Sequence, residues 1–214
     1  QKERIKQFKA AIDVLTLTAT PVPRTLYLAL SGLRDISTVH TPPPGRREVL
    51  SEVSAWQDGL VVEYIERELR RGGQVFFVHN RIEDIETQAR RLEKLIPDAS
   101  MRIAHGQMNE LELEQIMLAF IEREIDLLVC TTIIESGLDI ASANTIIVNR
   151  ADRFGLAQMY QQRGRVGRSD EQAYAYLLIP HESLLGKDAQ KRLKVLMEHS
   201  DLGSGFQIAM SDLK

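Results

Sequence analysis

The chain has 214 residues, 43% of them hydrophobic, which is enough to bury one sizeable core. Its formal net charge of -3 excludes a strong overall attraction to nucleic acid, so any contact with DNA must come from local basic clusters. Cys130 is the only cysteine, which excludes an intrachain disulfide, and no apolar stretch is long enough to span a bilayer. The histidines are scattered without the spacing of metal ligands. We therefore expect a cytoplasmic protein with no membrane contact and no metal site of its own.

The first part of the chain, residues 1–41, differs in pattern from the rest. Residues 12–18 alternate and contain β-branched side chains, which predicts a strand that ends before Pro21 and Pro23. A helix and a second short strand are expected to follow. Residues 42–47 combine three prolines, a glycine and two arginines, which is typical of a stiff linker between domains.

From residue 48 onward, predicted strands alternate with predicted helices. Residues 74–78 are continuously apolar, which is the pattern of a strand buried on both faces. The strands are expected at 48–54, 74–78, 101–104, 126–130, 145–148 and 173–179. This alternation predicts an α/β fold, with a mostly parallel sheet and helices on both of its faces.

Local signals place the helices between these strands. Asp58 is a candidate N-cap for the first helix, which ends at Gly72. Amphipathic spacing predicts a second helix over residues 82–96. Asn109 is a candidate cap for a third. The tail is expected to begin as a helix and to loosen at residues 203–205.

An arginine-rich stretch before the last strand is the strongest candidate for a functional site. Residues 161–168 contain three arginines and two glycines. A guanidinium is planar, stays charged and binds phosphate through two hydrogen bonds, while glycine lets the backbone approach a ligand. Arg165 and Arg168 would share one face of a helix, because side chains three apart are neighbours. The alternative is a solvated basic turn without a ligand.

Four further stretches follow predicted strands, where open parallel sheets bind ligands. They are residues 18–21, 79–81, 105–108 and 131–139. Thr131 and Thr132 offer hydroxyl groups to a phosphate. Gly137 allows close approach, and Asp139 could accept a hydrogen bond from a ribose. Each stretch also has a plain structural explanation as a turn, a polar loop or a helix cap, and the sequence contains no Gly-x-x-x-x-Gly-Lys-Ser/Thr loop.

Taken in order, these stretches resemble the later motifs of the superfamily 2 helicases. The matching residues are 18–20 for motif III, 75–81 for motif IV, 131–139 for motif V and 161–168 for motif VI. Within the superfamily, three stretches resemble the bacterial transcription-repair coupling factors: residues 17–26, 31–35 and 154–158. RecG-type helicases are the nearest other relatives. The resemblance covers essentially the whole chain.

The resemblance implies a RecA-like fold and a division of the chain into four parts. Residues 1–41 would be a remnant of the first RecA-like lobe, and 42–47 the linker between lobes. Residues 48–180 would form the helicase C-terminal lobe, and 181–214 a translocation hairpin with a truncated loop. In the family, the phosphate-binding loop and the acidic metal box lie upstream. We therefore expect a fragment that is inactive alone.

The resemblance also implies roles for single residues. Arg165 and Arg168 would be arginine fingers that reach the γ-phosphate of ATP, and Gln161 would couple nucleotide state to lobe closure. Three residues would lie near the nucleotide: Gly137, Asp139 and Gly164. Seven would contact DNA: Thr131, Thr132, His79, Asn80, Arg81, His105 and Gly106. Two would serve coupling: Thr18 and Thr20. The ligands of the Mg2+ that accompanies ATP would lie in the missing first lobe.

The function implied by the resemblance is the second motor lobe of an ATP-dependent translocase on double-stranded DNA. In this family the motor couples transcription to nucleotide excision repair by displacing stalled RNA polymerase. Its partners are RNA polymerase and the repair protein UvrA, bound through other domains. Two alternatives stay open: a lobe of a RecG-like fork-remodelling helicase, and a non-catalytic helicase-like binding module.

Overall fold

Parallel strands form one sheet in the computed structural model. The structure describes residues 37, 39, 47–132, 143–167, 170–199 and 204–212, apart from the side chains of residues 182, 206 and 212. The strands are β1 (Leu50–Ala55), β2 (Gln74–His79), β3 (Met101–Ala104), β4 (Leu127–Cys130), β5 (Ala143–Asn149) and β6 (Tyr174–Ile179). The α-helices are α3 (Asp58–Arg70), α4 (Ile82–Leu95), α5 (Glu110–Ile121), α6 (Leu156–Arg163), α7 (Lys187–Glu198) and α8 (Gly205–Asp212). Short 3-10 helices are η2 (Ala151–Arg153) and η3 (Glu182–Leu184).

The strand order in the sheet is β1-β6-β5-β2-β4-β3, and every pair of neighbours is parallel. β2 lies in the middle, where Phe77 is opposite Val129 of β4 on one side and Ile147 of β5 on the other. All six residues of β2 are buried, as expected for a strand covered on both faces. The predicted α/β fold with a mostly parallel sheet is confirmed.

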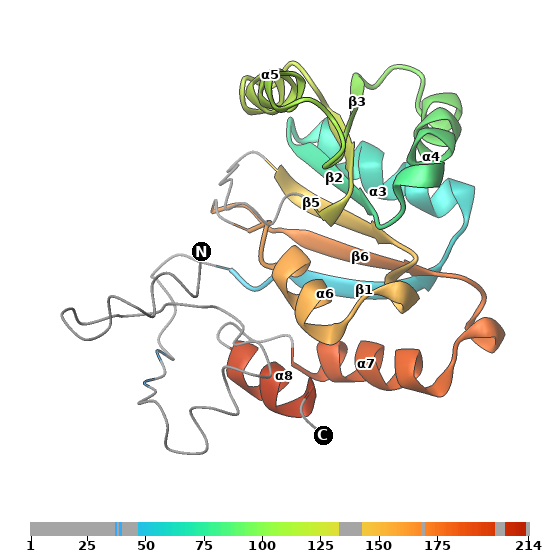
Figure 1. Ribbon diagram of the computed structural model, residues 1–214, viewed down its shortest axis with the longest axis vertical. Coiled ribbons are helices and arrows are strands. Elements are labelled where there is room, and N and C mark those ends of the chain that lie inside the picture. Colours follow the sequence, from blue (N-terminus) through green and yellow to red (C-terminus); the bar gives the residue numbers. More distant parts are fainter. Residues whose placement is uncertain are drawn as a thin grey trace.

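Helices cover both faces of this sheet (Figure 1). Successive side chains of a strand point to opposite faces, so β2 contributes to two cores. Val75 and Phe77 belong to the core on the side of α3 and α4. Phe76 and Val78 belong to the core on the side of α5, α6 and α7. The two layers of helices leave the strand ends as the places where a ligand can reach the sheet.

Of the two predicted N-caps, the structure confirms one and contradicts the other. Asn109 caps α5, and its side-chain oxygen accepts a hydrogen bond from the backbone N–H of Leu111 at 3.0 Å, which confirms the prediction. Asp58 is not the N-cap of α3 but its first helical residue. Its carboxylate instead accepts from Trp56 Nε1 at 2.7 Å and pairs with Arg91 of α4 at 2.6 Å. The prediction was wrong because a stronger pair of donors competes for this carboxylate.

The C-terminal part contains more helix than the sequence predicts. α8 begins at Gly205, within the residues that were expected to loosen. Ser204 precedes it, and its hydroxyl donates to the carbonyl of His199 at 2.9 Å. Figure 1 shows α7 and α8 together beneath the sheet, on the side of α6. The structure describes residues 37 and 39 alone within 1–41, so the expected first-lobe remnant, with Thr18 and Thr20, lies outside the described residues.

Candidate functional site at the carboxyl edge of the sheet

The loops that follow four neighbouring strands meet at the carboxyl edge of the sheet. β5, β2, β4 and β3 lie side by side in that order and run in the same direction, so their last residues are neighbours. The residues that follow them are Asn149 and Arg150 after β5, Asn80 and Arg81 after β2, Thr131 and Thr132 after β4, and His105 and Gly106 after β3. The residues predicted to contact DNA therefore gather along one edge, and their role stays a prediction.

His79, the last residue of β2, is 3% exposed and fully engaged. Its Nε2 lies 2.8 Å from Asp84 Oδ1, and Asn149 Nδ2 lies 3.1 Å from its Nδ1 and 3.3 Å from Gln88 Oε1. An amide nitrogen only donates, so Nδ1 accepts and Nε2–H donates to Asp84. Partial burial raises the pKa of Asp84, but the hydrogen bond from His79 and the charge of Arg81 outweigh it and hold that pKa below its usual value. The imidazole thus fixes the loop after β2.

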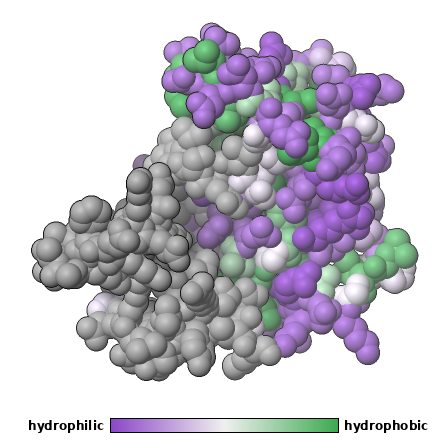
Figure 2. Space-filling view, in the orientation of Figure 1, coloured by the Kyte–Doolittle hydropathy of each residue, from purple (hydrophilic) through white to green (hydrophobic). Residues whose placement is uncertain are grey.

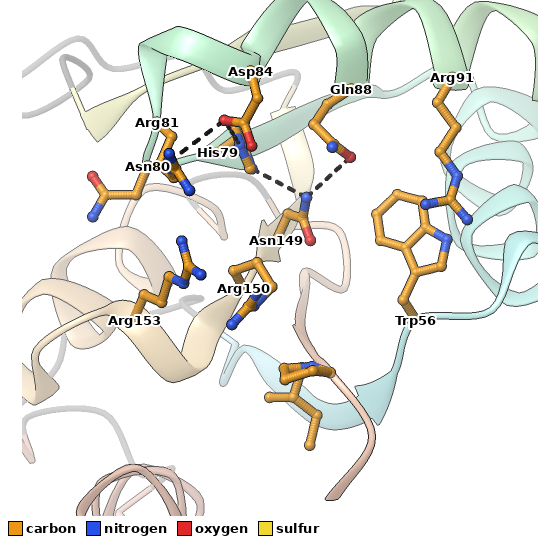
Figure 3. Close-up of a pocket in the computed structure, with 12 residues that line it drawn as sticks. Trp56, His79, Asn80, Arg81, Asp84, Gln88, Arg91, Asn149, Arg150 and Arg153 are labelled. Carbon is orange, nitrogen blue, oxygen red and sulfur yellow. Dashed lines mark hydrogen bonds and ion pairs between the residues drawn. The ribbon is translucent and has the colours of Figure 1, made fainter. Parts of the chain in front are cut away.

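A cavity of about 220 Å³ lies beside this network (Figure 3). Its charged lining comes from the loops after β2 and β5 and from α4: Arg81, Asp84, Arg91, Arg150 and Arg153. Arg150 and Arg153 were not identified from the sequence. They directly follow the predicted strand 145–148, so the rule that sites follow strands could have found them.

The loops after β3 and β4 are tied to each other. The backbone N–H of Thr131 donates to the carbonyl of Ala104 at 3.2 Å, and Thr131 is 7% exposed. The backbone N–H of His105 lies 3.4 Å from Met108 Sδ, and Gly106 occupies the turn that follows. His105 Nδ1 is buried and has no hydrogen-bond partner within the described ranges. The rest of the stretch after β4, with Gly137 and Asp139, lies outside those ranges.

The arginine-rich stretch leaves helical geometry before its second arginine. α6 ends at Arg163, Gly164 is its C-cap, and Gly167 has a left-handed backbone with φ +78°. The expectation that Arg165 and Arg168 share a helical face is therefore wrong, because glycine ends the helix between Arg163 and Arg165. Arg165 is half-buried in the turn, while Arg168 lies outside the described residues, so the proposed pair of fingers stays a prediction.

Arg163 is buried, although nothing in the sequence distinguishes it from the other two arginines of residues 161–168. It is 5% exposed, and its guanidinium donates to the carbonyls of Leu196 at 3.3 Å and His199 at 2.9 Å. The ring of Tyr160 lies 4.8 Å from its Cζ. Arg163 therefore holds the end of α7 against α6. Gln161 is half-buried in the last turn of α6.

Other chemistry is limited in the described part of the chain. There, no three His, Cys, Asp or Glu side chains gather as metal ligands. Cys130 is completely buried at the end of β4, and burial raises the pKa of its thiol, so it remains a protonated core residue. The helices described here include none long and apolar enough to cross a membrane.

Comparison with known proteins identifies the family. Residues 57–170 match the model of the helicase conserved C-terminal domain. The chain belongs to this family. Over its full length it is 58% identical to the transcription-repair-coupling factor of Myxococcus xanthus, and over 99% and 100% of its length it is 55% and 54% identical to those of Bacillus subtilis and Escherichia coli. The chain spans only 18% or 19% of the length of these relatives.

Solved structures share the architecture. A structure of RecG bound to a three-way DNA junction superposes with a TM-score of 0.78 at 37% identity, over 95% of this chain and 27% of that one. The helicase Dbp5 of S. cerevisiae, bound to RNA and ADP BeF3, superposes with a TM-score of 0.68 at 14% identity, over 99% and 58% of the two chains. At that identity the second likeness shows the fold alone. Together they confirm the RecA-like helicase C-terminal fold.

Proposed function

We propose that this chain is the second motor lobe of an ATP-dependent double-stranded DNA translocase that couples transcription to nucleotide excision repair. The observation that supports this most is the identity of 51% to 58% along the whole chain to relatives named transcription-repair-coupling factor. The proposed action of the intact protein is to displace stalled RNA polymerase. The proposed partners, RNA polymerase and UvrA, would bind other domains.

The proposed domain division is the one that the resemblance in sequence implies. Residues 48–180 would be the helicase C-terminal lobe, preceded by a first-lobe remnant at 1–41 and a linker at 42–47, with the translocation hairpin at 181–214. The sheet, β1 to β6, and its helices α3 to α6 fall within 48–180, and α7 and α8 within 181–214. The contacts of Arg163 with the end of α7 support a hairpin that moves together with the arginine-rich stretch.

The proposed nucleotide contacts lie around the end of α6. When ATP is bound between two lobes, Arg165 and Arg168 would stabilise the charge on the transferring phosphoryl group, and Gln161 would sense lobe closure. Gly137, Asp139 and Gly164 are proposed to lie near the nucleotide. The glycines fit this role, because Gly164 caps α6 and Gly167 has a left-handed backbone, so Arg165 lies in the turn between them. The Mg2+ ligands are proposed to lie in the first lobe, as the resemblance implies.

The proposed DNA contacts lie along the carboxyl edge of the sheet. The candidates are Thr131, Thr132, His79, Asn80, Arg81, His105 and Gly106. Their placement on three neighbouring strands supports a track for one sugar-phosphate backbone, read without base contacts. Because the His79 ring is enclosed by Asp84 and Asn149, residue 79 would act mainly by positioning Asn80 and Arg81.

The experiment that tests the motor is Arg165→Ala in the intact protein. An arginine finger contributes roughly 10³–10⁵ in rate. We expect ATP turnover to fall by about that factor while the affinity for duplex DNA is largely kept. Arg90→Ala is a matched control, because that side chain is 68% exposed on α4 and pairs only with Glu86 at 3.6 Å in the described structure. Near-normal turnover by the Arg165 variant would remove the finger assignment.

Two alternatives can be separated by activity assays on the intact protein. A RecG-like fork-remodelling helicase is supported by the 37% identity to RecG, but the higher identity to the coupling factors favours the first proposal. Fork reversal without displacement of stalled RNA polymerase would favour the RecG-like alternative. A non-catalytic binding module would show no DNA-stimulated ATP turnover at all.

A further inference from the structure

The cavity at the carboxyl edge is lined mainly by cations. Four arginines face it against one carboxylate, that of Asp84. Figure 3 shows Arg153, on the loop after β5, extending towards Arg81 and Asp84 on the other side, with Arg150 beside it. Hydrophilic residues also dominate the side of the molecule towards which β1 and β6 run, at the right of Figure 2. The cavity therefore favours an anion.

Two of the four arginines already have strong partners. Arg91 pairs with Asp58 at 2.6 Å, and its Cζ lies 4.4 Å from the ring centre of Trp56. Arg150 makes two bonds of 2.9 Å with Asp152, which lies outside the lining. These two arginines shape the walls, and their charges are largely compensated.

The other two arginines keep their donors available. Arg81 lies 3.8 Å and 3.9 Å from Glu83 and Asp84, too far for good hydrogen bonds, and its side chain is 50% exposed. Arg153 is exposed, and its guanidinium has no hydrogen-bond partner among the residues that the structure describes. Asp152, beside it in the chain, is taken by Arg150. Arg81, which has only these two long ion pairs, and Arg153 thus present available guanidinium donors from opposite sides of one cavity.

The loop that presents Arg153 is held rigidly. Arg150 has a left-handed backbone with φ 56°, which is uncommon outside glycine and reverses the chain directly after β5. The backbone N–H of Arg153 donates to the carbonyl of Arg150 at 2.9 Å. From α7, Arg192 donates to the carbonyls of Asp152 at 2.9 Å and Phe154 at 3.2 Å. A guanidinium on such a preorganised turn loses little freedom when it binds.

We propose that this cavity binds one phosphoryl group of a nucleic-acid backbone, with Arg153 and Arg81 as its ligands. The inference rests on the proposed function, because the cavity adjoins the loop after β2 that is proposed to face DNA. At about 220 Å³ it is smaller than the roughly 300–1,000 Å³ of sites for drug-sized ligands, so it suits one phosphate better than a whole nucleotide. Guanidinium groups match phosphate oxygens in shape and charge.

The test measures binding of the 214-residue chain to a labelled DNA duplex by fluorescence anisotropy, between about 50 and 200 mM salt. We expect Arg153→Gln to weaken binding by about tenfold, and to reduce the slope of log affinity against log salt by about one unit. Arg153→Lys keeps the charge and should keep the slope. Arg70→Gln is the control, because that side chain is 70% exposed at the opposite edge, where α3 leads into the start of β2.

A second arm separates backbone phosphate from free phosphate. Inorganic phosphate is titrated into the isotopically labelled chain, with sodium chloride at matched ionic strength, and the amide signals of η2 are followed. We expect weak phosphate binding that Arg153→Gln abolishes. Phosphate binding that depends on Arg153, combined with DNA binding that does not, would overturn the assignment to DNA. If wild type binds DNA and Arg153→Gln matches it in affinity and slope, the inference fails while the proposed function stands. If wild type binds neither ligand, the inference fails, and the proposed function is decided by the Arg165→Ala test in the intact protein.

Discussion

At the scale of single residues, two buried glutamines are expected to respond in opposite ways to substitution by leucine. Gln162 of α6 is completely buried, and neither polar atom of its amide has a hydrogen-bond partner among the residues that the structure describes. Gln74 of β2 is 3% exposed, but its Nε2 donates to the carbonyls of Phe120 at 2.7 Å and Ile125 at 2.6 Å. An unpaired buried polar group costs about 1–3 kcal/mol, whereas a paired one stabilises the fold.

We therefore predict that Gln162→Leu raises the free energy of unfolding by about 1 kcal/mol or more, and that Gln74→Leu lowers it by about 1–3 kcal/mol. In the second variant the two carbonyls that Gln74 satisfies are left unpaired. Urea unfolding followed by circular dichroism measures the free energy of unfolding of both variants. Because both replace glutamine by leucine, each is a control for the change in side-chain size in the other. A loss of stability in Gln162→Leu would show that the amide has a partner in solution.

At the scale of elements, Glu68 links α3 to the sheet from a buried position. The carboxyl is 1% exposed, and its Oε2 accepts hydrogen bonds from Arg71 and from Thr145 of β5. Its Oε1 has no partner in the described structure, and a Cβ on Gly73 would lie 1.7 Å from it. Burial raises the pKa of Glu68 by more than its hydrogen bonds with Arg71 and Thr145 lower it.

The raised pKa of Glu68 makes the stability of the fold depend on pH. The folded state binds this proton more tightly than the unfolded state, where the pKa is about 4.3. The stability that Glu68 contributes is therefore lost as the pH rises from the pKa of Glu68 in the unfolded state through its pKa in the folded state. We predict that Glu68→Gln, which never ionises, gains stability relative to wild type between pH 4 and 7, as measured by urea unfolding. Glu66→Gln, exposed on the same helix, should show no such trend. If Glu68→Gln instead loses stability relative to wild type as the pH rises, the hydrogen bonds of Arg71 and Thr145 lower the pKa of Glu68 by more than burial raises it.

The elements that the sequence predicted well are those with a local cause. β2 is recognisable because its apolar residues are continuous, and the start of α5 because Asn109 has a free side-chain oxygen close to the first turn. The predictions were wrong where contacts with other parts of the structure determine the local conformation. Asp58 does not cap α3, because Trp56 and Arg91 compete for its carboxylate. α8 forms directly after Ser204, where glycines on both sides had suggested a loose chain.

At the scale of the whole molecule, the parallel sheet could be predicted but its order could not. Alternating strands and helices require parallel pairing, yet nothing local in β1 shows that it pairs with β6, far away in the chain. The same limit applies to the site. Arg150 and Arg153 face Arg81 only because β5 lies beside β2. The burial of Arg163 likewise depends on α7, which follows it in the chain by more than one element.

The last prediction concerns the division of the motor between two lobes. The sequence contains no Gly-x-x-x-x-Gly-Lys-Ser/Thr loop, and the described residues contain no acidic cluster that could hold Mg2+. An arginine finger stabilises charge on a phosphoryl group only where a loop and a metal ion hold the nucleotide. We therefore expect the 214-residue chain alone to hydrolyse no ATP, with or without duplex DNA, in a coupled phosphate-release assay. The intact protein is the positive control. ATP turnover above background by the chain alone, lost in Arg165→Ala, would place a complete nucleotide site within these residues and contradict the two-lobe proposal.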